Sequence, residues 1–392
     1  MRSNCRYLST SRNLSRSETT LISGSLRCSA KLRDFPLRGP HPELRRPSDV
    51  YFPSKGTTLA PMRTQDVDAL LVLSFGGPEG QDEVIPFLRR VVAGRGVPDE
   101  RLEAVAEQYR YFGGVSPINE VNRDLVERLT ENAPVEWQGQ QVYLGNRNSE
   151  PFLADTMTKM AADGVRTAVV FPTSAFSSYS GCRQYRENLA AALAESGADL
   201  DLKIVPKFHD HPTLQEIWTE RLAAALPGSE PVRVVFVTHS VPISDSVKYR
   251  PQHEALAERI ATAAAAEAGM ADLDWRMAYQ SRSGPPHQPW LEPDIGEEVT
   301  AAAEAGVKRL LVVPIGFLSD NLEIRWDLDV TAGKLAEELG VAYQRVEPPQ
   351  DDPRFIEMIY DLIEEGDGIP CRVGCCPNPR QELPTVGERA DD

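Results

Sequence analysis

A histidine that follows an apolar segment is the first residue of this chain with clear chemical potential. Residues 232–237 form a mostly apolar run, and Thr238, His239 and Ser240 follow directly. A buried parallel strand with this pattern would bring the imidazole to the carboxyl edge of a sheet, where open α/β proteins place their active sites. A neutral imidazole binds divalent transition metals and accepts protons near neutral pH. Alone, a histidine after a strand is more often a hydrogen-bonded loop residue.

A second strand end supplies carboxylates. Residues 309–315 form another apolar run, and an apolar loop leads from them to Glu323. Glu323 and Asp327 are four residues apart, so both carboxylates would share one face of a helix. Solvated helix faces carry such pairs too, but Trp326 lies between these two acids. We therefore expect His239, Glu323 and Asp327 to act together on a cation and on protons.

The glycines after the first expected strand raise the alternative of nucleotide binding. Gly76 and Gly77 are followed by Pro78, which removes a backbone donor where a phosphate would need one. Neither the dinucleotide fingerprint nor the P-loop pattern occurs in the chain. The sequence therefore disfavours a nucleotide site.

Composition indicates a two-domain acidic protein. The chain has 392 residues, of which 41% are hydrophobic, enough for two packed domains. No apolar run approaches the roughly 18 residues of a membrane span, so the sequence predicts a soluble protein. The net charge is −16, and residues 62–392 alone hold 31 basic and 54 acidic side chains. A body this acidic disfavours nucleic acid and suits a cation or a non-phosphate ligand.

The first 61 residues differ from the rest of the chain. They are rich in Ser, Arg and Pro and contain 11 Lys/Arg but only 4 Asp/Glu. They fit an organelle transit peptide, a disordered tail, or residues upstream of a true start at Met62. We favour the start at Met62, and the lack of a clear apolar signal-peptide core makes secretion unexpected.

Alternating strand and helix patterns predict an α/β protein with two Rossmann-like domains, each a parallel sheet flanked by helices. The expected domains are 62–226 and 227–366, joined near Pro227, with a disordered or non-native extension over 1–61 and a cysteine-bearing tail over 367–392. The expected strands are 69–74, 141–145, 167–171, 202–205, 232–237, 275–280, 309–314 and 342–345. The expected helices are 84–92, 99–111, 120–131, 151–164, 180–196, 213–226, 251–268, 294–305, 323–339 and 355–365.

The cysteines do not form a secreted disulfide framework. Two of the six, Cys5 and Cys28, lie in the first 61 residues. The other four are Cys182, Cys371, Cys375 and Cys376. In an intracellular protein such thiols bind a metal or a cluster, or they are simply free.

Taken together, these segments resemble the ferrochelatase family over about residues 66–366. The order and spacing of several short motifs carry the resemblance. They are Leu73-Ser74-Phe75-Gly76-Gly77-Pro78, Tyr109 with Gly113-Gly114-Val115-Ser116-Pro117, Thr173-Ser174-Ala175-Phe176-Ser177-Ser178-Tyr179-Ser180, Thr238-His239-Ser240-Val241-Pro242, Tyr279-Gln280-Ser281-Arg282, and Pro314-Ile315-Gly316-Phe317 with Ser319-Asp320. The resemblance implies a chelatase-like fold and a lyase that inserts ferrous iron, as its substrate, into a porphyrin held between the two halves.

The resemblance also assigns residues by position. His239 and Glu323 match the family's iron-binding pair, and Asp327 matches the next turn of an acidic helix that conducts metal or protons. Ser116 and Tyr185 match positions that contact the porphyrin in bacterial members, and Tyr109 and Arg95 are further candidates, for the propionate side of the ring. Two residues depart from the family pattern: Asn321 stands where many members have histidine, and Glu79 stands where some have a tyrosine that approaches the iron.

The loop at Gly76 and the cysteine-bearing tail resemble the actinobacterial branch of the family. That branch implies a [2Fe–2S] cluster on Cys182, Cys371, Cys375 and Cys376, although the same thiols could be structural. It also implies coproporphyrin III as the substrate, a cytoplasmic location and handover of the product to a coprohaem-processing enzyme. Protoporphyrin IX as substrate, insertion of cobalt or nickel, and a metal or haem carrier without turnover are the alternatives.

The expected mechanism follows from porphyrin chemistry. Metalation removes two pyrrole protons and delivers one Fe(II) to nitrogen atoms that a planar ring hides. A rigid site that bends the ring would expose them. We expect His239 to accept a pyrrole proton and Glu323 to share the metal and pass protons to Asp327. Phe317, Trp326 and Pro242 are the expected apolar walls.

Overall fold

The structure, a computed structural model, describes residues 67–226, 231–284, 287–365, 371–372 and 374–389. These residues all fall within one compact unit. The expectations for residues 1–61 and for the junction near Pro227 lie outside the described residues. Within the described residues, no helix is both long and apolar enough to cross a bilayer.

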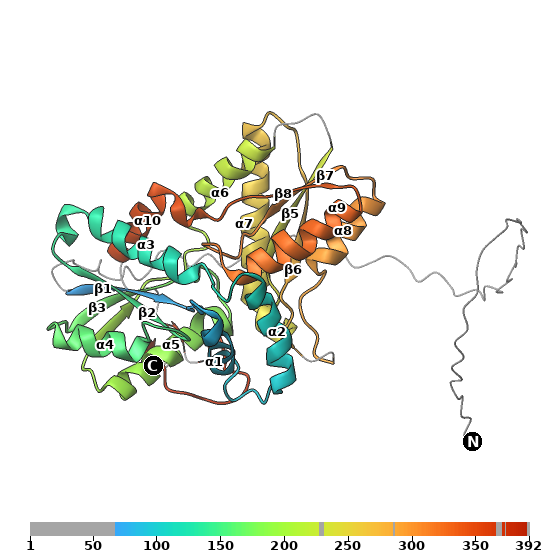
Figure 1. Cartoon of the computed structure of the whole chain (residues 1–392). Helices are drawn as coiled ribbons and strands as arrows, with labels where there is room; N and C mark the ends of the chain where they lie inside the picture. Colours follow the sequence, from blue (N-terminus) through green and yellow to red (C-terminus); the bar gives the residue numbers. More distant parts are fainter. Residues whose placement is uncertain (1–66, 227–230, 285–286, 366–370, 373, 390–392) are drawn as a thin grey trace, which may run out of the picture. The chain divides into compact units, whose positions relative to one another are not determined.

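The first half of the fold is a parallel sheet with strand order β2-β1-β3-β4 (Figure 1). Strand β1 is buried along its whole length, as its uninterrupted apolar sequence requires of a central parallel strand. The strands are β1 Ala69–Ser74, β2 Gln141–Asn146, β3 Thr167–Pro172 and β4 Asp201–Ile204. The helices are α1 Gln81–Val91, α2 Asp99–Tyr111, α3 Ile118–Glu131, α4 Leu153–Ala162 and α5 Gln184–Ser196, with a 3₁₀ turn η2 Val135–Trp137 and a π-helical turn η3 Tyr179–Arg183.

The second half repeats this topology, with strand order β6-β5-β7-β8 and all strands parallel. Its central strand β5 is buried from Val234 to Thr238 and ends at His239. The strands are β5 Val232–His239, β6 Asp274–Gln280, β7 Arg309–Val313 and β8 Ala342–Arg345. The helical elements are α6 Pro212–Ala225, η4 Ile243–Asp245, α7 Ser246–Glu267, α8 Ile295–Glu304, η5 Ile324–Ala332, α9 Gly333–Glu338, η6 Pro349–Asp351 and α10 Pro353–Glu364. The predicted α/β class with two parallel sheets flanked by helices is confirmed.

Two helices connect the halves. Helix α6 follows the first sheet in sequence but packs against α7 and β7, whereas α10 follows the second sheet and packs against α3 (Figure 1). The hydroxyl of Tyr360 on α10 donates to the carbonyl of Leu129 on α3 over 2.6 Å. One apolar core therefore runs through both halves, and it includes residues of both sheets.

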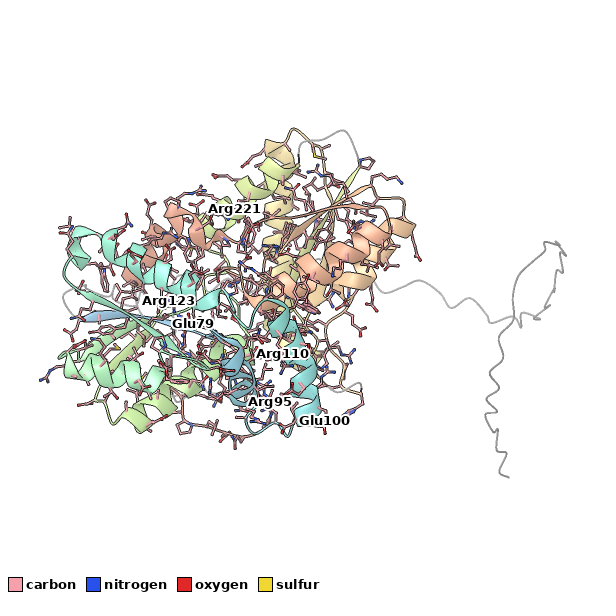
Figure 2. The ribbon with its side chains drawn as sticks, viewed as in Figure 1. Glu79, Arg95, Glu100, Arg110, Arg123 and Arg221 are labelled. Carbon is pink, nitrogen blue, oxygen red and sulfur yellow. The ribbon has the colours of Figure 1, made fainter. Side chains whose placement is uncertain are left out.

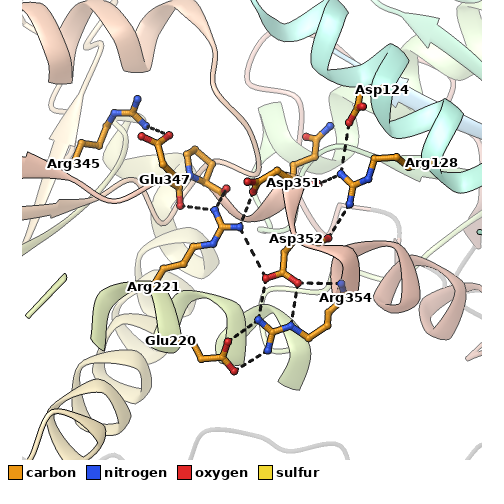
Figure 3. A network of polar contacts seen from close by, with 11 residues as sticks. Asp124, Arg128, Glu220, Arg221, Arg345, Glu347, Asp351, Asp352 and Arg354 are labelled. Carbon is orange, nitrogen blue, oxygen red and sulfur yellow. Dashed lines mark hydrogen bonds and ion pairs between the residues drawn. The ribbon is translucent and has the colours of Figure 1, made fainter. Parts of the chain in front are cut away.

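An arginine-rich network holds the segment between β8 and α10 in place (Figure 3). Arg128 of α3 donates to the carbonyls of Gln350 and Asp352 at 2.7 and 2.9 Å. Arg221 of α6 binds the carboxylate of Asp351, and Arg354 pairs with Glu220. Because Arg128 binds two backbone carbonyls, the network fixes the path of the chain as well as the side chains.

The continuous helix expected over 323–339 is a π-helix, η5, followed by the short α-helix α9. A second π-helical turn, η3, precedes α5 where a single helix over 180–196 was expected. Both π-helical segments carry residues expected to be functional, which agrees with the tendency of π-bulges to occur at functional sites.

Candidate active site

His239 is the last residue of β5, and its side chain is one-third exposed. Its Nδ1 lies 2.6 Å from the carbonyl oxygen of Ser240. A carbonyl can only accept, so Nδ1 carries the proton and donates it, and the lone pair of the neutral ring lies on Nε2. The backbone thus fixes the tautomer that leaves Nε2 able to bind a metal or take up a proton.

A buried polar cluster supports the backbone on either side of His239. The Tyr249 hydroxyl lies within hydrogen-bond distance of the His239 carbonyl and of the Thr238 hydroxyl. The Thr238 hydroxyl also lies 3.0 Å from Nε2 of His253. Burial lowers the pKa of His253 to about 3, so that ring is neutral and serves as a structural hydrogen-bonding group.

Glu323 faces His239 across the end of the second sheet. It stands immediately before η5, and its Oε2 lies 3.7 Å from Nε2 of His239. Metal–ligand distances of about 2.1 Å would let one ion touch both atoms at this separation. Among the described residues, no group of three or more histidine, cysteine or acidic residues is arranged to hold a metal. A two-residue open site suits the transfer of a metal better than its permanent retention.

Asp327 lies one turn further along η5 and is half-buried. Burial, helped by the negative charge of Glu323, raises the pKa of its carboxyl to about 6, although a hydrogen bond from Ser281 opposes the shift. The Ser281 hydroxyl donates to Oδ2 of Asp327. A carboxyl with a pKa near neutrality can both take up and release protons, which is the property a relay requires.

Two side chains position the π-helix that carries both acids. The Asn321 side chain accepts a hydrogen bond from the backbone N–H of Ile324 at 2.9 Å, as a helix-capping residue does. Arg345 of β8 binds Asp320, which precedes η5, at 3.0 Å and Asp329, within η5, at 2.7 Å. At the position where many family members have histidine, this chain therefore has a residue that caps the helix.

The first half of the molecule contributes aromatic residues to the same region. Trp326 of η5 packs edge to face against Tyr111, with ring centres 5.5 Å apart, and contacts Phe112. Tyr109 is buried near the end of α2, and its pKa is raised by burial and by the negative charge of Glu323. Tyr109 thus lies within the electrostatic influence of Glu323.

The other expected porphyrin contacts lie in different surroundings. Ser116 is buried beside Gly77, and the ring of Tyr185 lies under the guanidinium of Arg147 at 4.6 Å. Arg95 lies in the turn before α2 (Figure 2). Its pKa is lowered by desolvation and by the positive charges of Arg380 and Arg147.

Glu79 takes no part in this region. Its carboxylate forms an exposed ion pair with Arg123 at 2.6 Å. Glu79 has no phenol group, and its carboxylate is already paired with Arg123. It therefore does not replace the tyrosine that approaches the iron in some family members.

Three of the four cysteines expected to act together are adjacent. Hydrogen bonds with Cys182 and Cys375, together with burial, raise the pKa of the Cys376 thiol. Nζ of Lys248 lies 2.7 Å from Sγ of Cys375. Only the backbone of Cys371 lies within the described part of the chain.

Sequence reasoning missed Ser281 and Arg345. Ser281 has φ 58°, the only positive value among the described residues other than glycine. Nothing in its local sequence signals that conformation, although it belongs to one of the quoted motifs. Arg345 was read only as the end of a strand, because the two acidic partners that link it to η5 and the preceding loop lie 16 and 25 residues away.

Comparisons with known proteins show the family of this chain. The family model described as ferrochelatase matches residues 67–367. The curated coproporphyrin III ferrochelatase of Frankia alni is 46% identical over 344 residues, covering 80% of this chain and 88% of that protein. Those of Mycobacterium sp. (strain KMS) and Nocardia farcinica are 45% and 44% identical, covering 80% of this chain and 92% and 98% of theirs. The chain therefore belongs to the ferrochelatase family.

Proposed function

We propose that this protein inserts Fe(II) into coproporphyrin III to give coprohaem. The observation that carries the proposal is the separation of 3.7 Å between Nε2 of His239 and Oε2 of Glu323, with Nδ1 of the histidine held by a carbonyl. The similar proteins named as coproporphyrin III ferrochelatases support this choice of porphyrin over protoporphyrin IX.

The proposed mechanism divides the reaction between three side chains. Nε2 of His239 accepts one of the two pyrrole protons, and Glu323, which shares the incoming ferrous ion, passes the other to Asp327. Asp327, whose pKa is raised to about 6, takes protons onward because it exchanges them near neutral pH. Phe317, Trp326 and Pro242 would form apolar walls that hold the ring in a bent geometry that exposes its nitrogen atoms.

Ser116, Tyr185, Tyr109 and Arg95 are proposed to contact the porphyrin. Tyr109 would lie near the metal, because the negative charge of Glu323 contributes to its raised pKa. Arg95 would bind a carboxylate at the edge of the porphyrin ring. Tyr185 would act through Arg147, whose guanidinium covers its ring.

Anaerobic turnover of His239→Ala tests the assignment. We expect iron insertion to fall at least a hundredfold while coproporphyrin binding and the far-UV circular dichroism spectrum are retained. His287→Ala removes an exposed histidine and is the matched control. Near-normal activity of His239→Ala would overturn the mechanism.

The same assay with coproporphyrin III and protoporphyrin IX tests the substrate. We expect kcat/KM to favour coproporphyrin III by tenfold or more. A preference for protoporphyrin IX would overturn the choice of porphyrin. If the wild-type protein metalated neither porphyrin, a binding function without turnover would replace the enzyme assignment.

We further propose that Cys182, Cys371, Cys375 and Cys376 hold a [2Fe–2S] cluster. The adjacency of three of these thiols supports it, since thiolates are the usual ligands of such clusters. A bound cluster would cross-link the C-terminal segment to η3. Visible absorbance with near-stoichiometric iron and sulfide in anaerobically purified protein, lost in Cys376→Ser, is the expected result. Colourless, iron-free wild-type protein would contradict it.

Finally, we infer that the protein acts in the cytoplasm and passes coprohaem to an enzyme that converts its side chains. Coprohaem still carries propionates that protohaem lacks, so an oxidising decarboxylation step must follow. Cell fractionation tests the location, and a coupled assay with such an enzyme tests the transfer.

A further inference from the structure

Glu323 lies between two side chains that are buried in different parts of the molecule. Leu322, immediately before it, and Ile324, immediately after it, are 3% and 0% exposed, whereas the Glu323 side chain is 45% exposed. The backbone is helical here, and residues two apart on a helix project about 200° apart, so the two apolar side chains leave the chain on nearly opposite sides. The carboxylate of Glu323 emerges between them.

Leu322 belongs to an apolar core built by the first half of the molecule. The other buried members of this core come from α1 and α2, which pack against each other (Figure 1). They are Val84, Phe87, Leu88, Leu102, Ala106 and Tyr109. Among the buried members of this core in the described part of the chain, Leu322 alone comes from the second half.

Ile324 belongs instead to the core of the second sheet. That core includes Val235 and Val237 of β5, the strand that ends at His239. The residue after Glu323 is therefore fixed relative to the strand that carries the histidine, whereas the residue before it is fixed relative to α1 and α2. The position of the Glu323 carboxylate thus depends on both halves of the molecule.

A second contact with α2 lies three residues after Glu323. Trp326 packs edge to face against Tyr111, the last residue of α2, and against Phe112, with ring centres 5.5 and 6.5 Å apart. This contact is open to solvent, since Tyr111 is 59% exposed. Leu322 is therefore the more deeply buried of the two anchors on the first half.

Polar contacts of the same segment act within the second half. The Asn321 side chain accepts a hydrogen bond from the backbone N–H of Ile324, and Asp320 pairs with Arg345 of β8 at 3.0 Å. These contacts hold the segment to itself and to the second sheet. Anchorage to α1 and α2 comes from apolar packing, to which Leu322 contributes the buried side chain.

We propose that Leu322 is a positioning residue for metal insertion, which sets the reach of Glu323 toward His239. The inference rests on the proposed function and deepens it. One ion can touch Nε2 of His239 and Oε2 of Glu323 only while their separation stays near its present 3.7 Å. A displacement of about 1 Å at a reacting centre costs about a hundredfold in rate, and a neighbour anchored in a packed core prevents such a displacement.

Kinetics of Leu322→Ala test the positioning role, because this change removes the anchor and keeps both reacting side chains. We expect kcat for iron insertion into coproporphyrin III to fall at least tenfold and KM for Fe(II) to rise. The dissociation constant for coproporphyrin III, measured by fluorescence quenching, should stay within about twofold of wild type. Leu322→Met fills a similar volume and should restore most of kcat. The assays are run anaerobically at a temperature at which the variants are folded.

Leu102→Ala is the matched control, because it makes the same truncation in the same core. Leu102 lies near the start of α2 and is buried. This variant should lose a similar amount of stability in urea melts and keep a kcat near that of wild type. An equal loss of kcat in Leu322→Ala and Leu102→Ala, or a wild-type kcat in Leu322→Ala, would overturn the positioning role.

A smaller truncation keeps the proposal testable if Leu322→Ala does not fold. Leu322→Val should lower kcat and Leu102→Val should not, and equal kcat values in this pair would overturn the positioning role while the wild type metalates coproporphyrin III. Failure of the wild type to metalate coproporphyrin III would instead overturn the proposed function, and with it this inference.

Discussion

Gly316, in the loop that follows β7, lies directly against Thr238 of β5. A β-carbon placed on Gly316 would come within 2.6 Å of the Thr238 β-carbon and within 3.0 Å of its α-carbon, and closer still to its hydroxyl. The Gly316 N–H also donates to the carbonyl of Val237. The two strand ends that carry His239 and Glu323 are thus joined by a contact that only glycine permits.

Gly316→Ala is therefore expected to destabilise the protein. Thr238 cannot move aside, because its hydroxyl is tied to Tyr249 and lies 3.0 Å from His253. We expect the free energy of unfolding to fall by about 3 kcal/mol, as in other overpacked cores. Gly80→Ala, where an added β-carbon meets nothing within 4 Å, is the control and should stay within about 0.5 kcal/mol of wild type in urea melts.

Asp327→Asn should stabilise the protein at neutral pH. The pKa of Asp327 is raised to about 6, so between about pH 4 and 6 the folded chain holds a proton that the unfolded chain has released. Stability therefore falls as the pH rises through this window, and asparagine removes that loss. At pH 7 we expect a gain on the order of 1–2 kcal/mol, below what the full shift would give, because the carboxyl retains some contact with water.

Thermal melts of both proteins at pH 4 and pH 7 check this prediction. The gain should be much smaller at pH 4, where the folded carboxyl is protonated and the unfolded one is only partly ionised. An equal difference at both pH values would show that ionisation of Asp327 has no part in it.

Ser281→Ala should move the pH dependence of iron insertion. The Ser281 hydroxyl lowers the pKa of Asp327 by donating to the ionised carboxylate, so its loss should raise that pKa above 6. If ionised Asp327 takes up protons, kcat should rise with pH through about 6 in the wild type and about one unit higher in the variant. Ser281→Gly should show the same displacement with greater stability, because glycine accepts φ 58° without strain. Superimposable pH profiles would remove Asp327 from the relay.

Most of the fold could be predicted from the sequence. Apolar runs such as 69–74 and 232–237 are buried on both faces of their sheets, so composition alone identifies them. The π-helical geometry over 324–332 was not predictable, because the spacing of apolar residues here does not distinguish a π-helix from an α-helix. The packing of α10 on α3 was missed because it depends on surfaces about 230 residues apart.

In the candidate site, too, some features could be predicted from the sequence and others depend on tertiary contacts. His239 and Glu323 lie together because β5 and β7 are neighbouring parallel strands, which strand patterns indicate in advance. The tautomer of His239 and the conformation of Ser281 arise from tertiary contacts. Those contacts set the protonation and the local charge, and no local sequence pattern encodes them.

Glu323→Gln should abolish most of the activity without loss of the fold. The amide keeps the shape of the side chain but loses the charge that would bind Fe(II) and accept protons, so we expect kcat to fall at least a hundredfold. Loss of the negative charge of Glu323 should also lower the pKa of Asp327, because that charge contributes to the upward shift. Glu100→Gln neutralises an exposed carboxylate at the start of α2 (Figure 2) and is the charge-matched control, with unchanged turnover. Coproporphyrin fluorescence quenching should give the same dissociation constant for both variants and the wild type. If Glu323→Gln kept its kcat, the 3.7 Å pair with His239 would be a structural contact rather than the site of metal insertion.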